Sequence, residues 1–106
     1  MLLKIIKTFI SGLLLGMANV RIDEQDNPKA ARKLLARAKR FIIVCADVNE
    51  TWYHLIFGKI EYFEGNTGLA KTHYDIACKL LDKNPKFREW YEFKDTIQKF
   101  KDIYGY

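Results

Sequence analysis

The 106-residue sequence has little of what stabilises small secreted domains or spans a membrane. Its two cysteines, Cys45 and Cys78, are too few for a dense disulfide framework, which favours a reducing, cytoplasmic setting. The longest run without a charged residue, 8–20, has 13 residues, whereas a membrane-spanning helix needs about 20. Only two prolines and six glycines interrupt the chain, so uninterrupted helices are compatible with its composition.

The composition that remains, 49% hydrophobic and 29% charged, predicts one packed domain over residues 1–106. Asn27-Pro28 and Asn84-Pro85 each place an N-cap acceptor before a proline suited to the first helical turn. Asp47 and Glu50 have the spacing of a capping box, and Gly65 marks a helix end. We expect an all-α fold of about five antiparallel helices, near residues 2–23, 28–45, 48–64, 67–83 and 86–104.

The first of these segments is amphipathic. Its apolar residues recur at steps of three and four, as in a helix: Leu2, Leu3, Ile6, Phe9, Ile10, Leu13, Leu14, Met17 and Val20. The stripe left between them is polar: Lys4, Lys7, Thr8, Ser11 and Asn19. This pattern predicts a helix docked by its apolar side. The alternative is an exported protein whose residues 1–18 act as a signal peptide, because two lysines precede the apolar stretch and Gly16-Met17-Ala18 resembles a cleavage site.

The chain repeats itself when it is shifted by 39 residues. The shift aligns Ala31 with Ala70 and Ala38 with Ala77. Within each hairpin the two alanines lie seven residues apart, on one helix face: Ala31 with Ala38, and Ala70 with Ala77. A small side chain at such positions lets a neighbouring helix approach closely. The sequence therefore predicts two similar helical hairpins, with these four alanines against an adjacent helix.

The second hairpin resembles the tetratricopeptide repeat family, in degenerate form. Its matching residues are Gly58, Ala70, Tyr74 and Ala77, with Asn84-Pro85 after the second helix. The period of 39 is longer than the family's repeat of about 34 residues. The resemblance implies hairpins over about 2–45 and 48–83 and a terminal helix over 86–104 that covers the last repeat.

The resemblance also implies a binding groove. In this family the first helix of each hairpin lines the concave face, which places Trp52, Leu55, Lys59 and Tyr62 in the groove of the second hairpin. Tryptophan and tyrosine are rigid anchors of the kind that peptide-binding grooves use. The competing interpretation puts these aromatic residues in the core.

The positive charge of the chain is confined to its first half. Residues 1–46 hold nine Lys and Arg against three Asp and Glu, while residues 47–106 hold nine against ten. A basic patch is predicted on the second segment: Arg32, Lys33, Arg37, Lys39 and Arg40. Such a patch suits an acidic protein or an anionic lipid, and otherwise it is a solvated helix face. Nucleic acid is disfavoured because no aromatics are interleaved with the charges and no DNA- or RNA-binding motif is present.

The sequence contains no motif that is typical of a catalytic site. The chain has two histidines, His54 and His73, and no zinc-binding pair, phosphate-binding loop or nucleophile elbow. We expect no enzyme activity, no metal and no cofactor. The function predicted is a non-catalytic protein–protein interaction module of adaptor, chaperone or scaffold type. One alternative is a small immunity protein or antitoxin that inhibits a cognate toxin, and another is peripheral attachment to an anionic membrane through the basic N-terminal half.

Overall fold

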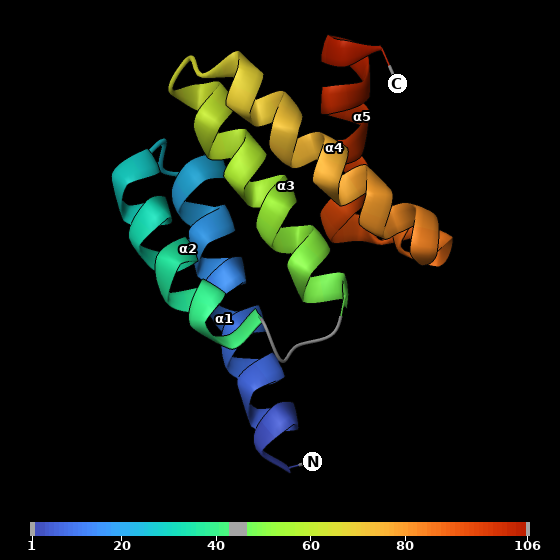
Figure 1. Ribbon diagram of the computed structural model, residues 1–106. Helices are drawn as coiled ribbons and strands as arrows, with labels where there is room; N and C mark the ends of the chain where they lie inside the picture. Colours follow the sequence, from blue (N-terminus) through green and yellow to red (C-terminus); the bar gives the residue numbers. More distant parts are fainter. Residues whose placement is uncertain (1, 43–46, 106) are drawn as a thin grey trace.

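The computed structural model describes residues 2–42 and 47–105 and is all-α over those ranges (Figure 1). Within those ranges lie five α-helices and a short 3₁₀ helix: α1 (Leu2–Asp23), α2 (Pro28–Ile42), α3 (Asp47–Phe63), α4 (Thr67–Lys83), η1 (Pro85–Glu89) and α5 (Tyr91–Tyr104). The described residues include no strand. The predicted fold class is confirmed, and the end of the predicted 28–45 segment lies outside the described residues.

Two of the predicted turn signals act where the sequence places them, whereas Asn84 makes no side-chain capping hydrogen bond. The side-chain Oδ1 of Asn27 accepts a hydrogen bond from the Ala30 N–H at 3.1 Å and so caps the first turn of α2. Gly65 adopts a positive φ of 87° directly after α3 and lets the chain turn back into α4. These two turns make α1 and α2, and then α3 and α4, antiparallel neighbours (Figure 1).

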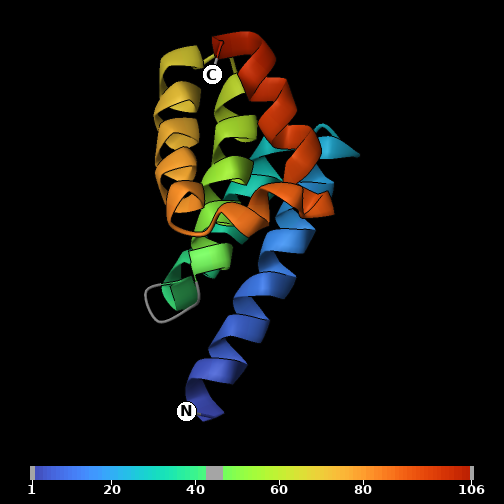
Figure 2. The same ribbon diagram turned by 90° about the vertical axis from the view of Figure 1, so that its right-hand side faces the viewer.

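The last predicted helix, 86–104, is wrong in its first turns. Asn84-Pro85 starts the short η1, and Trp90 then takes an extended conformation, with ψ of 134°, before α5 begins at Tyr91. The break brings aromatic rings together, because the Trp90 ring lies 4.7 Å from that of Phe87 and 5.9 Å from that of Phe93. The interruption redirects α5 so that it runs beside α3 and α4 (Figure 2).

The core consists of two hydrophobic clusters, and α3 contributes to both. One cluster joins α1, α2 and α3, and the other joins α3, α4 and α5. Ala31 and Ala38 lie in the first cluster, Ala70 and Ala77 lie in the second, and all four are fully buried. The prediction that these alanines pack inside the fold is confirmed.

The prediction that α1 docks by its apolar side is wrong. The buried residues of α1 lie on its other side: Ser11, Leu15, Ala18 and Ile22. Two of them are small, and polar contacts fix the same side, since Asn49 Nδ2 on α3 donates to Ser11 Oγ at 2.7 Å and to the Thr8 carbonyl at 3.0 Å. The N-terminal end of α1 extends beyond the other helices (Figure 2).

Candidate interaction surfaces

In the basic patch predicted on α2, the structure turns Arg32 toward α3 and leaves Lys39 exposed beside a cavity, while the remaining cations of the helix form one outward-facing row. Lys33, Arg37 and Arg40 are exposed, as is Lys29 one turn before them. At about 100° per residue these four side chains lie within about 80° of one another. They are opposite the buried side of α2, which holds Ala31, Leu34, Leu35 and Ala38. We call Lys29, Lys33, Arg37 and Arg40 the basic strip.

Arg32 belongs to the contact between α2 and α3. Its guanidinium pairs with Glu61 at 2.5 Å and also with Glu64, and it lies 5.8 Å from the centre of the Phe57 ring. Burial alone would lower the pKa of Arg32, but its hydrogen bonds to Glu64 and Glu61 outweigh burial and raise the pKa. Arg32 is therefore held by the second hairpin and is less accessible to a partner than the basic strip.

Lys39 lines a cavity of about 520 Å³ that also contains two histidines. His54 on α3 and His73 on α4 approach with their Nδ1 atoms 3.0 Å apart, and the Phe57 ring stacks on His73 at 4.0 Å. Burial, and then the neighbouring His73 and Lys39, lower the pKa of His54 to about 4. Burial also lowers the pKa of His73. One Nδ1 must donate and the other accept, so both rings cannot be protonated in this contact.

The predicted groove on α3 is covered by the chain's own helices. Leu55 is 1% exposed and belongs to the cluster that contains Phe93 and Phe100 of α5. The Trp52 ring lies 6.4 Å from that of Phe93, and the Tyr62 ring lies 6.4 Å from that of Phe100. In the folded chain α5 therefore occupies the face of α3 that the repeat resemblance assigns to a partner. Trp52 and Tyr62 remain partly accessible at its margins.

Lys59 is the charged member of the predicted groove, and it is 8% exposed. Its Nζ donates to Asn19 Oδ1 at 2.7 Å and to Asp23 Oδ2 at 2.8 Å, both on α1. Burial lowers the pKa of Lys59, and the hydrogen bond to Asp23 opposes that effect. The amine therefore links the two hairpins, and a partner would reach it only by displacing these contacts.

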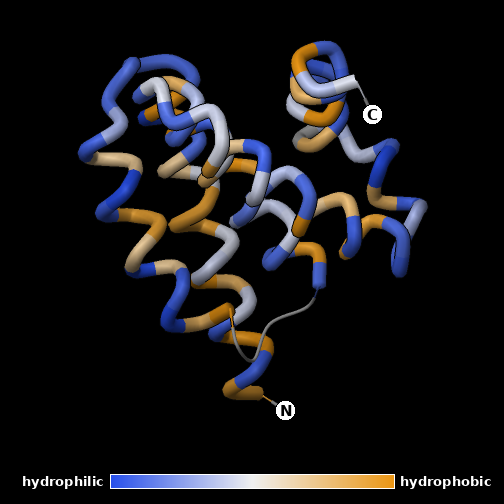
Figure 3. Tube along the Cα trace, turned by 45° about the horizontal axis from the view of Figure 1, so that its top comes forward, coloured by the Kyte–Doolittle hydropathy of each residue, from blue (hydrophilic) through white to orange (hydrophobic). Residues whose placement is uncertain are grey.

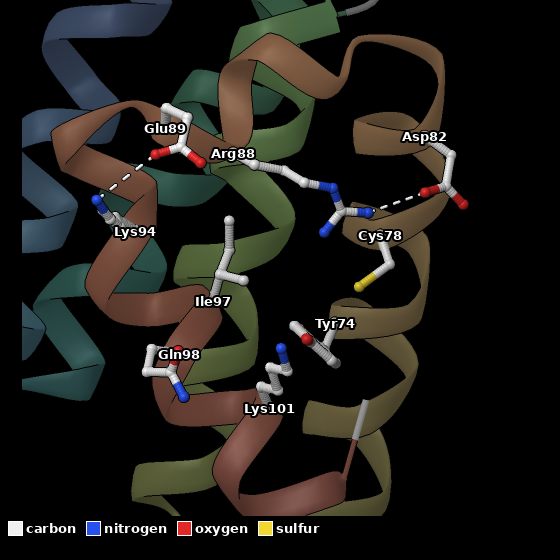
Figure 4. Close-up of a pocket in the computed structure, with 9 residues that line it drawn as sticks. All are labelled: Tyr74, Cys78, Asp82, Arg88, Glu89, Lys94, Ile97, Gln98 and Lys101. Atoms are coloured by element: carbon white, nitrogen blue, oxygen red, sulfur yellow. Dashed lines mark hydrogen bonds and ion pairs between the residues drawn. The ribbon is translucent and has the colours of Figure 1, made fainter.

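A cavity of about 450 Å³ lies between α4, η1 and α5, with Cys78 on its wall (Figure 4). Ion pairs at its edge join Arg88 to Asp82 at 2.8 Å and Lys94 to Glu89 at 3.5 Å. Burial raises the pKa of the Cys78 thiol, which is the direction opposite to that of activated cysteines. Within the described ranges no three His, Cys, Asp or Glu side chains are grouped so that they could hold a metal ion.

Among the described residues most of the exposed large hydrophobic side chains are on α1, where the sequence patterning predicted a buried apolar side. Seven side chains, between 39% and 71% exposed, form a continuous row that we call the apolar stripe: Leu2, Ile5, Ile6, Phe9, Leu13, Met17 and Val20. They fall within about 120° of arc and extend for about 27 Å along the helix. Hydropathy colouring shows hydrophobic segments where α1 leaves the bundle (Figure 3). By length and composition α1 could also cross a membrane, a test that signal sequences and core helices pass as well.

No protein-family model, no curated protein and no solved structure matches this chain. The resemblance to tetratricopeptide repeats therefore stays a prediction.

Proposed function

We propose that the chain is a non-catalytic interaction module that binds an acidic partner protein through the basic strip of α2. The observation that carries this proposal is the exposure of four cations in one row on a helix that contains no acidic residue. Within the part of the chain that the structure describes, no carboxylate pairs with Lys29, Lys33, Arg37 or Arg40. The row is thus available to an acidic surface from outside.

The contrast with Arg32 supports this assignment. Arg32 lies on the same helix, but its charge is compensated by Glu61 and Glu64 within the fold. The strip residues instead stand opposite the buried alanines and leucines of α2, so they add nothing to the core. A row of uncompensated like charges costs some stability through repulsion, and it accelerates association with a surface of opposite charge.

A charge-reversal experiment tests the proposal. Arg37→Glu with Arg40→Glu changes the net charge from +5 to +1, and so does the matched control, Lys79→Glu with Lys83→Glu on the exposed side of α4. A partner captured by the wild-type chain should be purified and titrated against all three proteins at rising salt. We expect weaker, more slowly formed complexes only with the α2 variant, and affinity that falls with salt.

Equal affinity of the two double variants, or binding that salt leaves unchanged, would contradict a role for the basic strip. If the purified partner is a nuclease or other toxin whose activity the chain abolishes, the module is a cognate inhibitor. Unchanged thermal melting of both variants is the required control, because exposed charges contribute little to folding.

A further inference from the structure

The apolar stripe of α1 lies on a different surface from the basic strip, and the fold itself leaves it uncovered. The other side of α1 is committed to the bundle through Leu15, Ala18 and Ile22, which are at most 4% exposed. Rolling the helix to bury the stripe would expose these residues and break the hydrogen bonds from Asn49 to Thr8 and Ser11. A row of exposed large apolar residues of this length is typical of a surface that binds something.

Charge identifies the kind of surface that can cover the stripe. Among residues 1–22 the charged side chains are Lys4, Lys7 and Arg21, and none is acidic. A second copy of the chain would bring together two N-terminal halves that each hold nine cations against three acids, so dimerisation through α1 is opposed by repulsion. An anionic surface is attracted by the same charges. At about 100° per residue Lys4 and Lys7 lie about 140–160° around the helix from the middle of the stripe, on its polar side. An apolar face opposite a basic polar face is typical of helices that lie in the interface of an anionic bilayer.

The shape of the molecule allows a bilayer to reach the stripe. The N-terminal part of α1 extends beyond the other helices, so a flat surface can contact it without meeting the rest of the bundle first (Figure 2). The opposite end of α1 and the turn into α2 carry the exposed acids Asp23, Glu24 and Asp26, which an anionic surface repels. The N-terminal end should therefore enter the interface more deeply than the turn. Long lysine side chains can keep their amines at the headgroups while their stems follow the helix.

We propose that the apolar stripe of α1 binds the surface of an anionic lipid bilayer and so holds the interaction module at a membrane. The contacts of Asn49 and the buried side of α1 keep the helix on the bundle, so the attachment is peripheral and does not span the bilayer. The stripe and the basic strip lie on different helices, and each faces away from the buried residues of its own helix. Membrane attachment can thus be tested independently of partner binding.

Flotation with vesicles tests the proposal on the full chain. Vesicles of phosphatidylcholine alone are compared with vesicles that also contain phosphatidylserine. We expect the chain to float with the anionic vesicles, and we expect high salt to weaken this binding. Lys4→Gln and Lys7→Gln should each lower the partition coefficient by about fivefold, if each lysine acts near the surface at its usual strength.

A matched pair of leucines tests the stripe directly. Leu13 in the stripe is 55% exposed and Leu69 on α4 is 54% exposed, so replacing either by glutamate changes charge and apolar area equally. Leu13→Glu should lower the partition coefficient by about tenfold or more, while Leu69→Glu should leave it unchanged. Phe9→Glu, at a position 66% exposed, provides a second stripe variant. Thermal melting of the variants shows whether each remains folded.

Five results would overturn the proposal. Equal binding to neutral and anionic vesicles, or no binding to either, would remove the role of lipid charge. Equal loss with Leu13→Glu and Leu69→Glu would remove the role of the stripe. Retention on vesicles through an alkaline carbonate wash would make α1 a spanning helix. A dimer in sedimentation that only the stripe variants dissociate, without vesicle binding, would assign the stripe to a second copy of the chain.

Discussion

Gly58 on α3 is the position where the packing of α5 can be tested with a single added methyl group. A Cβ built on Gly58 lies 3.2 and 3.3 Å from two ring carbons of Phe100 and 3.4 Å from the backbone oxygen of Ala70. Phe100 is fully buried, and its ring faces that of Tyr74 at 5.3 Å, so it has little room to move away. We expect Gly58→Ala to overpack the contact between α3, α4 and α5.

Gly12 on α1 supplies the matched control, because a Cβ there meets no atom within 4 Å. Each glycine lies inside a helix, so replacement by alanine gains about 1 kcal/mol of helix propensity at either site. At Gly58 overpacking costs about 1–3 kcal/mol against that gain. The free energy of unfolding should therefore rise by about 1 kcal/mol in Gly12→Ala and fall by up to about 2 kcal/mol in Gly58→Ala.

Urea titration followed by far-ultraviolet circular dichroism measures both variants, and equal m-values make the midpoints comparable. The cause is isolated by repeating Gly58→Ala in a Phe100→Leu background, where removal of the ring should let the alanine stabilise the protein as it does at Gly12. If Gly58→Ala stabilises the wild-type background as much as Gly12→Ala does, then Phe100 does not rest on Gly58, and the packing of α5 over α3 described above is incorrect.

Three further predictions concern single residues that are buried or half-buried. Ala70→Leu should overpack the second cluster and lower the free energy of unfolding by about 1–3 kcal/mol; an unchanged urea midpoint would contradict the close approach of α3 and α4. Because His54 has its pKa lowered from 6.5 to about 4, the unfolded chain binds more protons between these values. The free energy of unfolding should fall as pH drops from 6.5 to 4, by at most about 3 kcal/mol, and solvent screening makes the fall smaller. His54→Phe should flatten that part of the pH profile. Lys59→Met should leave stability unchanged or raise it, since Asp23 is 44% exposed and can be hydrated alone; a loss above about 2 kcal/mol in thermal melting would show that the pair stabilises the fold.

The positions of the helices follow from local signals that the sequence carries. Capping by Asn27, the positive φ at Gly65 and the alanines at a seven-residue spacing each act within one or two turns, so they need no knowledge of distant contacts. The same locality explains the failure at the last helix. Asn84-Pro85 does start a helical turn, but the extended conformation of Trp90 brings it against Phe93 and ends that turn early.

The candidate surfaces could be predicted only in part. The charges of the basic strip were visible because six cations without an acid occupy one short segment. The ion pairs that hold Arg32 against α3 could not be predicted, because Glu61 and Glu64 belong to the other hairpin. Likewise, the spacing of Trp52 and Tyr62 places them on one face of α3, but only the path of α5 shows that this face is covered.

By its own periodicity and capping residues, the sequence determined that the chain is helical, where most of its helices begin and end, and which alanines pack inside. Only the tertiary structure decided which side of α1 is buried. Apolar residues occur on more than one side of that helix, so the phase of the pattern cannot select one. The small residues Ser11 and Ala18 let α1 approach its neighbours closely, and Asn49 pairs with polar groups on that same side. Close packing and satisfied hydrogen bonds therefore turned the larger apolar side chains toward the outside.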